Sequence, residues 1–138
     1  MRALLAVLLL LIAQPADSHS YRTGGVMVGH VWAAPTRGSD TEVYVPLLNT
    51  APAADQLVSI IAPTAKLAEL IDGSSRRIGA IELPPNRPVA LKPGGLRIRL
   101  IGLDKPLRAG DRLKLTLVFA KAGTVAVEAH VEMGPSHG

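Results

Sequence analysis

The stretch RLKLTLVFAKAGTVAVEAHV, residues 112–131, decides the fold class of this chain. In each half, apolar side chains stand on every second residue: Leu113, Leu115, Leu117 and Phe119, and then Val125, Val127, Ala129 and Val131. Such a period of two is typical of a β-strand that buries one face. The segment AKAG, residues 120–123, joins the halves, so the stretch predicts a β-hairpin.

The rest of the chain continues this pattern. Further apolar strands are expected over 42–49 and 56–61, and no helical period is sustained. Pro46 lies inside the first of these strands and has no N–H to donate, which places it at an edge or a bulge. Turn-forming segments separate the strands: DGSS at 72–75, PPNRP at 84–88, KPGG at 92–95 and AGD at 109–111. The sequence therefore predicts an all-β sandwich with a single domain.

Residues 1–18 are expected to be a signal peptide. Arg2 precedes the apolar run 4–13, and small and polar residues follow it. That run is too short to span a bilayer, and no later stretch approaches the roughly 20 apolar residues of a membrane helix. The mature domain, residues 19–138, is thus expected to be periplasmic or secreted and not membrane-spanning. Its ends, 19–25 (HSYRTGG) and 134–138 (GPSHG), are expected to be short flexible tails.

Composition excludes several classes of function. The 138 residues include no cysteine, which excludes disulfides, thiolate metal sites, cysteine nucleophiles and a bacterial lipid anchor. The chain has one Phe, two Tyr and one Trp, so a secreted protein of this kind offers little on which to stack nucleic-acid bases. No motif places a nucleophile beside a base, and no Gly-rich phosphate loop is present, so we expect no enzyme.

A second informative stretch is LKPGGLRIRLIGL, residues 91–103. If the apolar residues of LRIRL face the core, Arg97 and Arg99 stand together on the other face. Basic residues there usually provide solubility and protect an edge from pairing. Alternatively, Arg97 and Arg99 form part of a surface that docks an acidic partner, because guanidinium donors form a planar fork that suits carboxylates. Arg76 and Arg77 belong to this surface only if their hairpin lies beside residues 97–99, which a resemblance to a known family implies.

Five segments carry a resemblance to a known family: GHVWAAPT (29–36), NTAPAADQLV (49–58), IELP (81–84), the run from LKPGG to LVF (91–119) and GTVAVE (123–128). Together they resemble the PCu(A)C family of periplasmic copper chaperones over nearly the whole mature chain. The resemblance implies a cupredoxin-like Greek-key β-sandwich in the periplasm. It also implies delivery of Cu(I) to a copper enzyme such as a respiratory oxidase, with a periplasmic copper protein or a membrane-bound copper oxidase as partner.

The copper ligands of typical members are missing, according to the same resemblance. Those members use a His, a Met and a His-x-Met pair, which fall here on Ala68, on or near Ser75, and on Arg97 and Arg99. A guanidinium has no free lone pair, whereas imidazole and thioether suit Cu(I). If the chain binds copper, as Cu(I) or Cu(II), other residues are expected to hold it. The alternative is that it binds no metal and acts as an interaction protein.

His19 is one candidate ligand, and signal cleavage decides its chemistry. A cut after Ala16 leaves Asp17-Ser18-His19 at the N-terminus, a square-planar nitrogen site for Cu(II) or Ni(II). A cut after Ser18, which the small residues Ala16 and Ser18 favour, makes His19 the first residue, able to chelate copper with its amine and ring as in a histidine brace. A cut after Ser20 removes His19.

The C-terminal segment HVEMGPSH supplies the other candidates, His130, Met133 and His137. Imidazole and thioether together are typical of Cu(I) sites. The alternative is that His130 shares an outward face with Glu128 and Glu132, that Met133 caps the core and that His137 belongs to a tail.

Two residues of a predicted first strand complete the candidates. Met27 and His30 lie on opposite faces by parity, so they do not converge on one metal. We expect His30 to be a core or edge histidine and Trp32 to be a packing residue.

Overall fold

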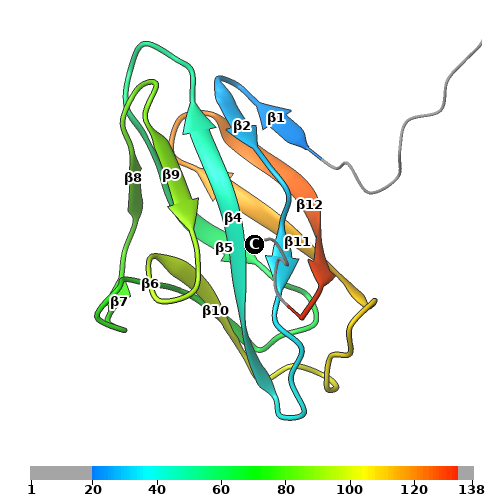
Figure 1. Cartoon of the computed structure of the whole chain (residues 1–138). Coiled ribbons are helices and arrows are strands. Elements are labelled where there is room, and N and C mark those ends of the chain that lie inside the picture. Colours follow the sequence, from blue (N-terminus) through cyan, green and yellow to red (C-terminus); the bar gives the residue numbers. More distant parts are fainter. Residues whose placement is uncertain (1–19, 134–138) are drawn as a thin grey trace, which may run out of the picture.

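The computed structural model describes residues 20–133, which form twelve strands and no helix (Figure 1). The strands are β1 (Tyr21–Thr23), β2 (Val26–Val28), β3 (Trp32–Ala33), β4 (Asp40–Asn49), β5 (Asp55–Ile61), β6 (Leu67–Ile71), β7 (Arg77–Ile78), β8 (Ile81–Leu83), β9 (Pro88–Leu91), β10 (Arg97–Ile101), β11 (Arg112–Phe119) and β12 (Gly123–Val131). The all-β prediction is confirmed. No helix able to cross a membrane occurs within this part of the chain.

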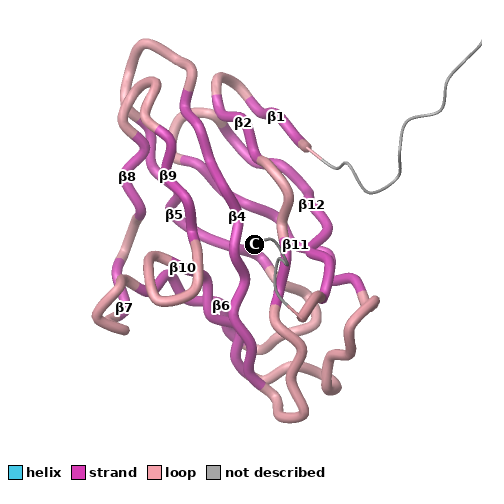
Figure 2. The backbone as a smooth tube through the Cα atoms, in the orientation of Figure 1, coloured by secondary structure: helices cyan, strands magenta, loops and turns pink. Residues whose placement is uncertain are grey.

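The long strand β4 belongs to both layers of the sandwich (Figure 2). Its first half pairs with β10 on one side and β3 on the other, within the order β7-β6-β10-β4-β3-β12-β11-β5-β8. Its second half pairs with β2 and β9. Because one strand changes partners along its length, the two layers remain hydrogen-bonded to each other and nearly close into a barrel.

Pro46 lies where β4 changes partners. It stands opposite Ala90 of β9, and its carbonyl accepts a hydrogen bond from the Gly29 amide at 2.9 Å. The expectation of an edge is wrong, because β4 has partner strands on both sides, but one of its two ladders is interrupted at Pro46. The missing N–H is tolerated because the pairing with β3 ends before Pro46 and the pairing with β2 begins after it.

The hairpin at 112–131 forms as the alternation predicts. β11 and β12 pair along their full length, and their alternating residues lie in the core, with Leu117 0 % exposed. Gly123 ends the turn with φ of 93°, a conformation that favours glycine. Asp55 of neighbouring β5 fixes this turn, because its carboxylate accepts hydrogen bonds from the amides of Lys121 (2.7 Å) and Ala122 (2.8 Å).

The N-terminal tail expectation is wrong for residues 21–23. They form β1, which pairs with β2. Two long-range hydrogen bonds hold β1 on the hairpin: the Glu128 amide donates to the Tyr21 hydroxyl (3.0 Å), and the Thr23 hydroxyl donates to the Ala122 carbonyl (2.9 Å). The expected signal peptide, His19, and the segment 134–138 with His137 lie outside the described residues.

Candidate functional site

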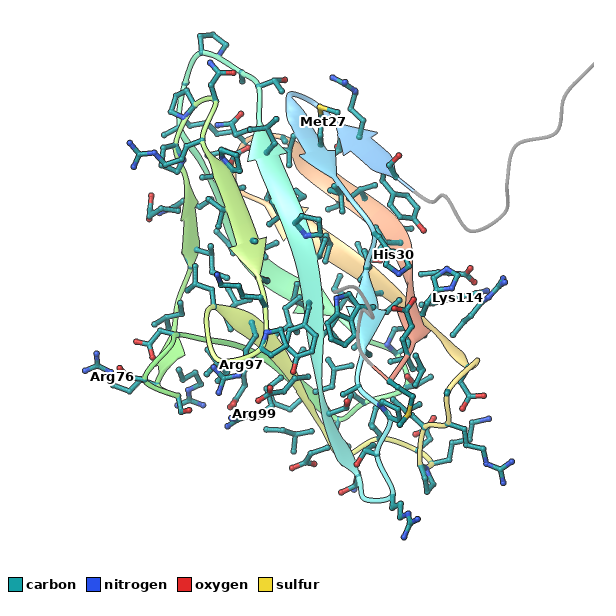
Figure 3. All side chains as sticks on the ribbon, viewed as in Figure 1. Met27, His30, Arg76, Arg97, Arg99 and Lys114 are labelled. Atoms are coloured by element: carbon teal, nitrogen blue, oxygen red, sulfur yellow. The ribbon has the colours of Figure 1, made fainter. Side chains whose placement is uncertain are left out.

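The outward-facing side chains of β10, β4, β3 and β12 form a continuous band across the sheet, which we call the outer row. Strand register sets its order: Arg99 lies opposite Glu42, Tyr44 opposite Trp32, and Trp32 opposite His130. In Figure 3, Arg97 and Arg99 lie at one end and His30 at the other. The row comprises Arg97, Arg99, Glu42, Tyr44, Trp32 and His130, with His30 and Glu132 beside His130.

Arg97 is buried, and its guanidinium ties three segments together. It donates from Nε to Glu42 Oε2 of β4 (2.8 Å) and from Nη1 to the carbonyls of Asp72 (3.1 Å) and Gly95 (2.8 Å). Nη2 donates to Ser75 Oγ (3.0 Å). The expectation of a solvated charge that protects an edge is wrong for Arg97, because β10 lies between β6 and β4 and the two adjacent turns cover the side chain.

Glu42 is the centre of charge at this end of the row. Besides Arg97, it accepts hydrogen bonds from Arg99 Nη2 (3.4 Å) and from the Tyr44 hydroxyl (2.9 Å). Burial by itself would raise the pKa of Glu42, but the hydrogen bonds from Arg97 and Tyr44 and the charge of Arg97 outweigh burial and hold this pKa below its usual value. Burial and the neighbouring Glu42 raise the pKa of Tyr44 to about 12.

The other two arginines lie across the β6–β7 hairpin, as expected. Arg76 pairs with Asp72 (3.5 Å) and Arg77 with Glu69 (3.2 Å), and their side chains are 77 % and 71 % exposed. Hydrogen bonds from the backbone amides of Arg76 and Ser74 lower the pKa of Asp72. The four guanidiniums face three carboxylates, so this end keeps a surplus of a single positive charge.

The four positions that the resemblance assigns to copper ligands do not share one face. Ser75 contacts Arg97. Ala68, however, stands opposite Leu100 and packs against the core, so it lies on the other face of the sheet from Arg99. The β6 residue opposite Arg99 is Glu69. That these positions are substituted ligands stays a prediction.

Two aromatic rings occupy the middle of the outer row. The rings of Trp32 and Tyr44 lie 4.5 Å apart between centroids and are tilted by 46°, so Trp32 is a packing residue as expected. Since Tyr44 also donates to Glu42, and Trp32 lies opposite His130, the arginine and histidine ends are linked by direct neighbours.

The histidine end brings together residues that the sequence separates. His30 Nε2 lies 2.7 Å from Glu132 Oε2, and the rings of His30 and His130 have centroids 5.2 Å apart, tilted by 43°. The His30 side chain is 40 % exposed. His30 lies in the connection between β2 and β3, not within a strand, so strand parity did not apply to it. Nothing in the sequence linked it to His130 and Glu132, because these contacts depend on the parallel pairing of β3 with β12, a hundred residues later.

The two C-terminal candidates that the structure describes behave differently. His130 shares the outward face with Glu128 and Glu132, as its parity predicts. Met133 is 84 % exposed, so the expectation that it caps the core is wrong. Its side chain lies beyond the end of β12, beside Arg37 and Arg108. Within residues 20–133, no group of three or more His, Asp or Glu side chains is placed to hold a metal ion.

The fold and its order of strands define the class of protein: a cupredoxin-like β-sandwich of the PCuAC type. The chain is 30 % identical to the copper-bound PCuAC domain from PmoF2, covering 84 % of this chain and 99 % of that one with a TM-score of 0.77. It is 28 % identical to the apo PCuAC domain from PmoF1, covering 84 % and 100 % with a TM-score of 0.79.

The family follows from the sequence itself. Residues 26–131 match the family described as putative lipoprotein LpqE-like, and the chain belongs to this LpqE-like family. It is also 25 % identical, over 126 residues, to the putative lipoprotein Lxx21020 of Leifsonia xyli subsp. xyli, covering 85 % of this chain and 75 % of the relative. The cupredoxin-like fold expected from the resemblance is thus confirmed.

Proposed function

We propose that this chain is an exported, non-enzymatic copper-handling protein that passes copper to another copper protein or to a copper enzyme such as a membrane-bound respiratory oxidase. The observation that carries the proposal is its 30 % identity to a copper-bound PCuAC domain over 99 % of that domain. Export rests on the signal-peptide layout of residues 1–18 and on the lipoprotein descriptions of the family and its relative.

Copper does not bind at the arginine end of the outer row in this proposal. A cation there would meet the Arg97 guanidinium, whose hydrogen bonds leave it fixed in place. Two like charges about 4 Å apart repel by about 4 kcal/mol near a protein surface. The candidate ligands are therefore His19, His130, Met133 and His137, all remote from Arg97 in sequence.

Native mass spectrometry of the chain exported to a bacterial periplasm tests this function. Spectra are recorded with Cu(I), with Cu(II) and without metal, and the mass of the apoprotein gives the cleavage site. We expect one copper per chain and a mature N-terminus at His19. Absence of bound copper in both oxidation states would contradict a copper-handling function.

A second function is favoured by the exposure of Arg76 and Arg77, at 77 % and 71 %. In it, the arginine end docks an acidic partner without any metal. Because Arg97 is buried, the two exposed residues would supply most of the contact, with Arg99 beside them. The double variant Arg76→Glu/Arg77→Glu separates the functions: it abolishes capture of the partner under this second function and leaves copper uptake unchanged under the first.

A further inference from the structure

The strongest unassigned feature is the pair of imidazoles at the histidine end of the outer row. Resting on the proposed function, we propose that His30 and His130 bind one copper ion between their rings, with Glu132 positioning His30. This site adds His30 to the candidate ligands and lies at the opposite end of the row from Arg97.

The spacing of the rings fits a shared ion. Two imidazoles that bind one metal through nitrogen at about 2.0 Å have ring centroids about 4.5 to 6.3 Å apart, depending on the angle at the metal. The observed 5.2 Å lies inside this window. The His30 side chain is 40 % exposed, so small adjustments of its ring, with the contact to Glu132 kept, do not disturb the core.

The hydrogen bond to Glu132 prepares His30 as a ligand. An ionised carboxylate only accepts, so Nε2 of His30 donates to it, and Nδ1 of the neutral ring then keeps its lone pair. A carboxylate on the far nitrogen of a histidine is the arrangement that orients metal ligands and raises their basicity. Imidazole suits copper in both of its common oxidation states.

The local charge opposes a cation less than the charge at the arginine end does. Around the two rings, the carboxylates of Glu128 and Glu132 balance two cations of β11: Arg112, which lies 3.7 Å from Glu128, and Lys114, which stands opposite Glu128. The arginine end, in contrast, carries a positive surplus. Since both ends of the outer row belong to one face, this difference in local charge favours the histidine end over the arginine end as the place where a copper ion binds. Two protein nitrogens leave further coordination positions to water or to a group of the recipient protein, which is compatible with release.

The test compares copper affinities of the exported full-length chain and its variants by competition with a chelator, for Cu(I) and Cu(II) separately. We expect His30→Gln and His130→Gln each to weaken binding by more than about tenfold, and Glu132→Gln by about tenfold. Glu82→Gln, at an exposed carboxylate of β8 outside the outer row, is the matched control with unchanged affinity. Thermal unfolding of His30→Gln, at a half-buried position, checks that the variant folds.

A second readout reports location. Cu(II) added to isotope-labelled protein broadens nearby NMR signals, and we expect the ring signals of His30 and His130 to disappear first. Full affinity in both His30→Gln and His130→Gln, or broadening confined to the terminal segments, overturns the site and leaves the proposed function standing. No copper binding by the wild-type chain overturns both.

Discussion

Replacing Glu42 by Gln isolates the charge that holds Arg97 in the protein. The substitution keeps the shape of the side chain and removes its negative charge, while Arg97 stays 8 % exposed with its two carbonyl acceptors and Ser75. Removing one partner of a buried ion pair costs about 3–5 kcal/mol. Glu42 is itself 28 % exposed, and a Gln oxygen can still accept, so the lower part of this range applies. We expect a loss of about 3 kcal/mol in the free energy of unfolding.

Urea unfolding followed by circular dichroism measures this loss. The matched control is Glu128→Gln, whose partner Arg112 is 55 % exposed at 3.7 Å, and which is expected to lose less than about 1 kcal/mol. A third variant, Glu42→Gln with Arg97→Met, should recover part of the loss, because no unpaired charge is then left buried. If Glu42→Gln costs no more than Glu128→Gln, Arg97 does not depend on its carboxylate, and the description of the arginine end as a fixed ion-pair network is refuted.

Three further outcomes follow from the same structure. The pKa of Glu42 is lowered in the folded state, so its contribution to stability is present above its unfolded pKa, near 4.5, and is lost as the pH falls through the folded value. The free energy of unfolding of Glu42→Gln should therefore depend less on pH in the acid range than that of the wild type. Equal slopes of this free energy against pH in the two proteins would argue against the lowered pKa. Tyr44, with a pKa of about 12, should ionise about two pH units above an ordinary tyrosine while the protein is folded, so its neutral form contributes stability that is lost as the pH rises from about 10 towards 12. The difference between the absorbance titrations of wild type and Tyr44→Phe isolates this ionisation, and a midpoint near 10 in the difference would exclude the shift. Leu117→Ala, at a site 0 % exposed, should cost about 2–5 kcal/mol in urea unfolding, and a cost below about 1 kcal/mol would mean that the β11 core face is assigned wrongly.

Much of the fold could be predicted because strand alternation is a local signal. The hairpin at 112–131 follows directly from its period of two, and the position of its turn follows from the segment AKAG, residues 120–123. Pro46 could not be placed, because its environment depends on β4 leaving one pair of neighbours for another. β1 was mistaken for a tail because it is only three residues long and is fixed by contacts with residues about a hundred positions away.

The candidate site was predictable only in part, for a related reason. Parity placed Arg97 and Arg99 on one face but said nothing about burial, which the turns around Asp72 and Gly95 impose on Arg97. The ion pair with Glu42 joins residues 55 positions apart. Similarly, His130 was recognised from its chemistry, whereas His30 required the three-dimensional pairing of β3 with β12.

In the proposed copper site, this LpqE-like chain keeps copper away from its arginines and holds it at its histidines. The most direct test is an anomalous difference map at the copper absorption edge from crystals of the copper-loaded, exported protein. We expect one strong peak between the rings of His30 and His130 and none near Arg97 or Ser75. A peak beside Arg97 and Ser75, or no peak between the two rings in copper-loaded crystals, would contradict the proposed site.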